Sequence, residues 1–447
     1  MRVLGLMPIV GAVVLSMMPS ELNSASPAVD DVEQEEVVGE EVVEDTTDAT
    51  EDEAETPKPT VRTGFGYEAL PEGSQQPWRL LRGLQRAQDN IIAGRPRAED
   101  AYRLLLVNLS RVMASLDNSV WNHERNVDAL ATFILLGGNT ELGYKALQKT
   151  QLDELQTQPL KASLAFAQRD LARAQRLLAE FDPSALPPSM AAHFALARSM
   201  AVAATDIELA KTYLNKARKL APGTLVEEAA LRRLIRIAGE TRSFNDLVFL
   251  SKTYMSRFRN SYYFKDFLTN VSFGLVRMPK EREEDVLSLL KQILANADMS
   301  EKVGVAIYVS RHSTLAGKKT LSYWTSELGL DLLPEGSRDY ARLQLYKFAI
   351  DVVEKEKVPA ALGMLEALQD FDFSEKDKLI LSSALLLGKQ ILQDPVASQS
   401  MQSGLGNQSL DENQAVDETR MVEVESPVVK KAEDVLSRSS ELLEGIL

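Results

Sequence analysis

The feature that most constrains the fold is a long succession of helix-period apolar patterns over residues 77–393. One such face carries Leu81, Leu84 and Ile91, and this is the spacing of residues that share one side of an α-helix. Convincing runs of alternating polarity, which would indicate strands, are missing. Because 447 residues exceed what a single core usually organises, we expect several units or a repeat array. The pattern predicts an all-α protein.

Small and large apolar residues alternate along these helices in a way typical of tetratricopeptide repeats. The residues that fit one repeat are Phe194, Ala197 and Ala201 on its first helix, and Ala210, Leu214, Ala217 and Pro222 on its second. Similar patterns occur at 345–368 and, less clearly, at 162–181. Together they predict a tetratricopeptide-like α-solenoid of helical hairpins over residues 65–393, in which each pair buries its apolar face by stacking on its neighbours. An irregular helical domain is the alternative.

Residues 1–28 have the order of a secretory signal peptide. Arg2 precedes an apolar run over residues 3–18, and small residues follow at positions 24–28. The run is shorter than the ~20 residues of a membrane span, so we expect cleavage after Ala25 or Ala28 and no stable membrane insertion afterwards. An uncleaved anchor is the alternative.

Residues 29–64 are predicted to be a disordered acidic segment. Fourteen Asp and Glu residues fall within 29–60, without an aromatic residue, so little apolar surface can offset the entropy of ordering. The segment is either a solvated spacer or an acidic arm that docks on a basic surface. Residues 61–447 carry a net charge of only −2, which gives little attraction to nucleic acid.

The end of the chain changes composition again. Residues 394–425 are rich in Ser, Gln, Asn and acidic residues and are predicted to be a polar linker. Over 426–447, Val428, Ala432, Leu436 and Leu443 lie on one stripe, which predicts an amphipathic C-terminal helix. This helix either caps the array or pairs with another chain.

A search for catalytic chemistry finds no convincing motif. The chain has no cysteine, which excludes thiolate metal sites and cysteine nucleophiles. His123 begins an HExxH-like pattern, but Val127 occupies the second histidine position. Residues 317–320, Gly-Lys-Lys-Thr, end like a phosphate-binding loop but lack its earlier glycine and strand. We therefore expect a noncatalytic protein without a metal or cofactor; an envelope hydrolase with an unrecognised site is the alternative.

Aromatic and basic residues concentrate within 252–267. The candidate partner-binding residues there are Tyr254, Arg257, Phe258, Arg259, Tyr262 and Tyr263. One interpretation is a set of core aromatics with solvated charges. The other is a contact surface, since Tyr and Arg are favoured anchors in protein interfaces. Export and net acidity argue against nucleic-acid binding.

Three segments resemble the MotC family, periplasmic motility proteins of alphaproteobacteria. They are residues 77–97, residues 126–139 with the sequence NVDALATFILLGGN, and residues 216–267. The resemblance covers about 65–280 well, whereas the acidic segment and residues 395–447 look specific to this chain. It implies a location in the periplasm and action with MotB, the stator protein that anchors the torque generator to the cell wall. The expected function is a noncatalytic flagellar motor component that binds the periplasmic region of MotB; a tetratricopeptide-like assembly factor of another envelope complex is the alternative.

Overall fold

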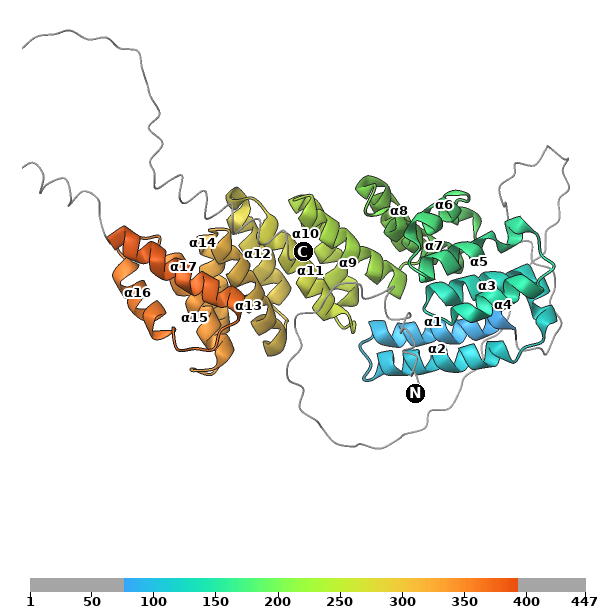
Figure 1. Cartoon of the computed structure of the whole chain (residues 1–447), viewed down its shortest axis with the longest axis horizontal. Helices are drawn as coiled ribbons and strands as arrows, with labels where there is room; N and C mark the ends of the chain where they lie inside the picture. The colour runs from blue at the N-terminus through green and yellow to red at the C-terminus, as the bar shows by residue number, and fades with distance from the viewer. Residues whose placement is uncertain (1–75, 393–447) are drawn as a thin grey trace, which may run out of the picture. The chain divides into compact units, whose positions relative to one another are not determined.

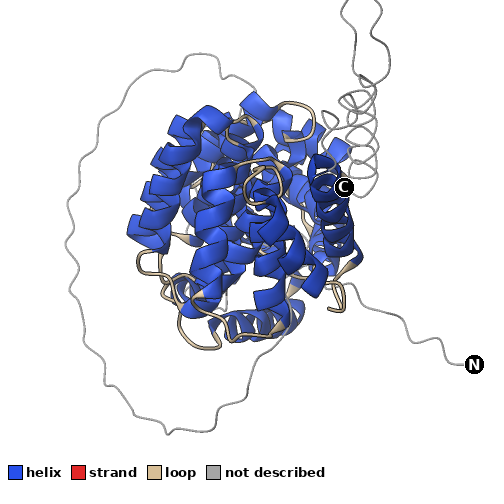
Figure 2. Ribbon diagram, turned by 90° about the vertical axis from the view of Figure 1, so that its left-hand side faces the viewer, coloured by secondary structure: helices blue, strands red, loops and turns tan. Residues whose placement is uncertain are grey.

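The computed structural model describes residues 76–392 of the chain. Within this range, seventeen α-helices and three short 3₁₀ helices are joined by turns and loops, without a strand (Figure 2). The predicted all-α fold is therefore confirmed for these residues. The predicted signal peptide 1–28, acidic segment 29–64, linker 394–425 and terminal helix 426–447 lie outside the described residues.

The elements follow one another in chain order, coloured from blue to orange in Figure 1. The first elements are α1 (Pro77–Ile92), α2 (Ala98–Ala114), η1 (Asn118–Asn122), α3 (Glu124–Leu135), α4 (Thr140–Lys149), α5 (Glu154–Ala167), α6 (Leu171–Ala179), η2 (Pro183–Ala185), α7 (Pro188–Val202) and α8 (Ile207–Leu220). The remaining elements are α9 (Leu225–Glu240), α10 (Phe244–Phe258), α11 (Phe264–Arg277), η3 (Lys280–Arg282), α12 (Glu283–Leu294), α13 (Met299–Leu315), α14 (Lys319–Leu330), α15 (Arg338–Asp351), α16 (Val358–Ala367) and α17 (Glu375–Leu392).

The predicted helical hairpins form and stack in series. Helices α7 and α8 pack on each other, and the repeat-pattern residues Phe194, Ala197, Ala210 and Leu214 are all buried. The patterns at 162–181 and 345–368 likewise become the pairs α5–α6 and α15–α16. Alternate helices also touch, from α7 to α9, α11, α13, α15 and α17 in turn. Contact between successive pairs is the packing of an α-solenoid, which agrees with the predicted architecture.

The N-terminal helices depart from a simple linear stack of helical repeats. Besides its neighbours α2 and α3, α1 contacts α9, and α3 contacts α7. In a linear stack, each repeat would contact only the repeats beside it. The first hairpin therefore packs back on helices more than a hundred residues further along the chain.

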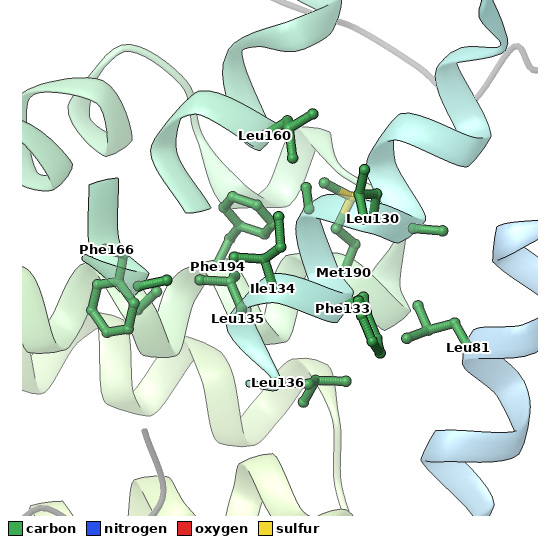
Figure 3. Close-up of a cluster of buried hydrophobic side chains, with 14 of the residues drawn as sticks. Leu81, Leu130, Phe133, Ile134, Leu135, Leu136, Leu160, Phe166, Met190 and Phe194 are labelled. Carbon is green, nitrogen blue, oxygen red and sulfur yellow. The ribbon is translucent and has the colours of Figure 1, made fainter. Parts of the chain in front are cut away.

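Three groups of buried apolar residues form the interior. The first spans α1 to α7 and also includes Leu225 of α9 and Tyr263, the second spans α7 to α14, and the third α13 to α17. Figure 3 shows part of the first, where Leu81 of α1 lies on the side of Phe133 of α3, and Phe194 of α7 lies on the side of Leu135 of α3. Ile92 packs against both the first and the second group, so these two cores are continuous.

The Gly-Lys-Lys-Thr stretch at 317–320 has a structural role. Lys318 is buried, and its Nζ donates hydrogen bonds to the carbonyl oxygens of Val276 and Met278 at the end of α11. Carbonyls at a helix end lack partners within the helix, so this ammonium group satisfies them. Burial lowers the pKa of Lys318 to about 8, although nearby Glu283 opposes the shift.

Among the described helices, none has both the length and the apolar character that crossing a lipid bilayer requires.

The crossing of α9 and α11 depends on two glycines. A Cβ added at Gly239 would lie 2.6 Å from the Cα of Gly274, which is backbone and cannot rotate away. We therefore expect Gly239→Ala to force the two helices apart and to lower the free energy of unfolding by about 1–3 kcal/mol. Chemical denaturation measures this change.

Gly83 provides the matched control, because it lies in helix α1 with no atom within 4 Å of its added Cβ. Gly83→Ala should be neutral or stabilising by up to about 1 kcal/mol, since alanine is the better helix former. Equal effects of the two substitutions would contradict the close-crossing argument.

Candidate protein-interaction site around α10 and α11

The structure brings the six predicted contact residues together at the junction of α10 and α11 but places three of them in the interior. Tyr254, Phe258 and Tyr263 are 0%, 1% and 6% exposed. The ring of Tyr254 stacks on Phe267 with centroids 4.2 Å apart. These three side chains belong to the core and present no surface to a partner, so the predicted contact narrows to Arg257, Arg259 and Tyr262.

A buried carboxylate organises this junction. Glu228 on α9 is fully buried, and its Oε1 accepts hydrogen bonds from Tyr254 Oη at 2.6 Å and Ser261 Oγ at 2.7 Å. Arg232, one turn further along α9, has its Nε 3.9 Å from the same oxygen. Burial raises the pKa of Glu228, while the arginine charge and the two hydroxyl donors oppose that shift.

The same network reaches the N-terminal hairpin. Arg232 donates to Asp266 of α11 at 3.1 Å, and its guanidinium lies 4.6 Å from the ring centroid of Tyr263. The Tyr263 hydroxyl donates to Glu99 of α2 at 3.2 Å, and Glu99 also pairs with Arg103 at 2.7 Å. One connected set of polar groups therefore joins α2, α9, α10 and α11.

Backbone contacts close the junction beside this network. The amide of Tyr262 donates to the carbonyl of Ile91 at 3.0 Å, so the loop before α11 is bonded to the end of α1. Gly94 has a φ of +65°, and a Cβ there would lie 2.0 Å from the carbonyl oxygen of Asn260. Such a position accepts only glycine. These contacts hold the first hairpin against the loop before α11.

The two arginines of the predicted contact are paired within the fold. Arg257 Nη1 lies 2.7 Å and 2.9 Å from the two carboxylate oxygens of Glu227, which is 2% exposed. Arg259 Nη2 donates to Glu301 at 3.0 Å, and its guanidinium lies 3.9 Å from the ring centroid of Phe264. The Arg257 side chain is still 48% exposed, so it can meet a partner without leaving Glu227.

Two aromatic residues remain accessible on α10 and in the loop that follows it. Tyr262 is 55% exposed, and its ring packs edge-on against Tyr263. Phe249 on α10 is 57% exposed, with the guanidinium of Arg218 6.0 Å from its ring centroid. Sequence reasoning missed Phe249, although helical spacing could have found it: the inner face of α10 carries Leu247 and Leu250, and Phe249 lies off that stripe.

The arrangement is suited to holding helices together: Glu228 is fully buried, and Asp266, with a side chain 45% exposed, pairs with Arg232. Glu228 and Asp266 have raised pKa values, for which burial is the main cause. Their hydrogen bonds go to Tyr, Ser and Arg side chains of neighbouring helices. In residues 76–392, no three His, Asp or Glu side chains gather as a metal site would require.

Removing the central carboxylate tests the network. Glu228→Ala would leave Arg232 without one of its buried counter-charges and would leave two hydroxyl groups without an acceptor. We expect the free energy of unfolding to fall by about 3–5 kcal/mol, the usual effect of breaking a buried pair from one side. Urea denaturation measures it.

The control is Glu208→Ala on α8, where an exposed carboxylate pairs with Lys211. Its removal should change stability by no more than about 0.5 kcal/mol. A small loss in both variants would show that the buried network contributes little.

Comparison with known proteins identifies relatives. The family model described as Chemotaxis protein MotC matches residues 14–446. A protein named Chemotaxis protein MotC from Rhizobium meliloti (strain 1021) is 24% identical over 334 residues, covering 73% of this chain and 75% of the relative. No solved structure matches the chain.

The family match extends well beyond residues 65–280, where the sequence resemblance is strongest. It includes the whole acidic segment and all but the last of residues 395–447. The expectation that these two regions fall outside the family resemblance was therefore wrong. With a match over most of its length, the chain belongs to the MotC family.

Proposed function

We propose that this protein is a noncatalytic periplasmic component of the flagellar motor that binds the periplasmic region of MotB and supports motor rotation. The observation that carries the proposal is membership of the MotC family over residues 14–446. The name of that family and of the Rhizobium relative indicates a role in chemotaxis and motility. Both the partner and the location go beyond those names.

The sequence supports the proposed location. A short positive start, an apolar run and small residues occupy positions 1–28 in the order of a secretory signal peptide. Export across the inner membrane would place the helical array beside the periplasmic region of a stator protein. Intact-mass measurement on protein released by osmotic shock would show whether the first residues are removed.

The helical array supports the proposed activity. Stacked helical pairs present extended surfaces suited to holding a protein segment. Phe249 in the second turn of α10 and Tyr262 after the end of that helix expose aromatic rings, and Arg257 exposes part of its guanidinium side chain. Aromatic and arginine side chains are the residue types most enriched among strong contacts in protein interfaces. We therefore place the proposed contact on this exposed set.

Calorimetric titration of the purified chain with the periplasmic fragment of MotB tests the proposal. Phe249→Ala and Tyr262→Ala should each weaken binding by roughly 5- to 30-fold, equivalent to 1–2 kcal/mol of lost contact. Because both side chains are more than half exposed, the melting temperature should hardly change. Leu315→Ala, at a similarly exposed residue of α13, is the matched control and should bind normally.

The arginines need a different interpretation. Arg257→Ala and Arg259→Ala would remove partners of Glu227 and Glu301, so the double variant should lose stability as well as any contact. Normal affinity in the Phe249 and Tyr262 variants would remove this surface from the interface. No measurable binding by the unmodified chain would contradict MotB as the partner and favour a scaffold of another envelope complex.

A further inference from the structure

A stripe of positive charge lies along the first ten residues of helix α1. Arg79, Arg82 and Arg86 are exposed and occupy positions i, i+3 and i+7 of α1, which places them on one face. We call these three residues the α1 arginine stripe. Among residues 76–392, no carboxylate forms an ion pair with any of them.

The positive charge is concentrated around one indole ring. The guanidinium carbons of Arg79 and Arg82 lie 5.2 Å and 5.0 Å from the centroid of Trp78, and that of Arg125 on α3 lies 3.5 Å from it. The ring face attracts each cation, but like charges held this close repel one another. A carboxylate group beside the stripe would relieve that repulsion.

The chain itself supplies carboxylates just before this helix. Residues 30–55 contain fourteen Asp and Glu residues and no basic residue, whereas residues 61–447 have a net charge of −2. From Glu55 to Arg79 there are 24 residues, which can span up to ~80 Å. The stripe itself covers only ~10 Å of helix. Connection within one chain also raises the effective concentration of such a ligand into the millimolar range.

We propose that residues 30–55 bind the α1 arginine stripe within the same molecule. The segment is then an intramolecular ligand that neutralises the stripe, and any anionic partner of α1 has to displace it. The contact is electrostatic and therefore weakens as salt shortens the range of charge interactions. This contact does not require MotB, and it uses no residue of the α10–α11 junction.

The sequence allows this contact to be measured in the full chain. The chain has no cysteine, so Thr46→Cys attaches a single nitroxide spin label inside the acidic segment. The three tryptophans, Trp78, Trp121 and Trp324, give three indole N–H signals in an NMR spectrum, and Trp78→Phe assigns the one beside the stripe. A bound segment brings the nitroxide to Trp78, so that signal should disappear while the Trp324 signal remains. Reducing the nitroxide should restore it.

Substitutions in the stripe separate binding from simple proximity along the chain. In Arg82→Gln/Arg86→Gln, and in about 0.5 M sodium chloride, where charge interactions reach only a few ångströms, the Trp78 signal should recover with the label intact. The matched control is Arg173→Gln/Arg176→Gln, which removes the same charge from exposed positions of α6 and should leave the loss of signal unchanged.

Two outcomes would overturn the proposal. If the Trp78 signal is lost equally in the stripe variant and the unmodified chain, the label reaches α1 only because it is tethered nearby. If both double variants restore the signal equally, the segment responds to overall charge rather than to this stripe. Circular dichroism on each variant checks that helicity is retained.

Discussion

The carboxylate of Glu228 has been removed from water at the point where four helices meet, and much of the N-terminal architecture follows from how that charge is compensated. Burying an ionised carboxylate is strongly unfavourable unless hydrogen bonds and an opposite charge replace its hydration. Here two hydroxyl donors and Arg232 do so at Oε1, whereas Oε2 has no hydrogen-bond partner among residues 76–392. Since the partners of Oε1 come from α9, α10 and the loop before α11, this oxygen is satisfied only when those elements are correctly placed.

This constraint extends to the first hairpin through Tyr263. Its ring lies beside Arg232, and its hydroxyl reaches Glu99 of α2, 164 residues away in the chain. The Tyr262 amide adds a backbone hydrogen bond to Ile91. A linear stack of helical hairpins requires no such long-range hydrogen bonds. The junction therefore bonds the first helical hairpin to residues more than a hundred positions later in the chain. Helices α11 to α17, in contrast, contact one another in sequential order.

Much of the fold could be predicted from sequence because it is local. Positions such as Ala210 and Leu214 carry the spacing of a packed helix, and the structure buries them as expected. Whether the aromatic and arginine residues of 252–267 are buried or exposed could not be predicted, because such residues occur together both in protein cores and in interfaces. Which of these residues are buried and paired within the fold depends on Glu227, Glu228 and Glu99. These carboxylates lie 26 to 164 residues from their hydrogen-bond partners. One available signal was helix α9 itself, where carboxylates and arginines interrupt a strongly apolar sequence.

Residues that stabilise the fold and residues of the proposed contact lie on the same short segment. Inward-facing residues of α10 and its following loop fix the junction, and outward-facing residues of the same elements form the proposed contact surface. Such a surface is held by the core beneath it, so little ordering is needed when a partner binds. The function proposed for this MotC-family protein depends on that rigidity.

Native-state hydrogen exchange at the Tyr262 amide tests the closed junction most directly. This amide lies in a loop but donates to Ile91, so its exchange should require opening of the junction. We predict protection comparable to that of core amides in α9, close to the free energy of global unfolding. Exchange as fast as that of exposed loop amides, with α9 still protected, would contradict the claim that the first hairpin is bonded to α9–α11.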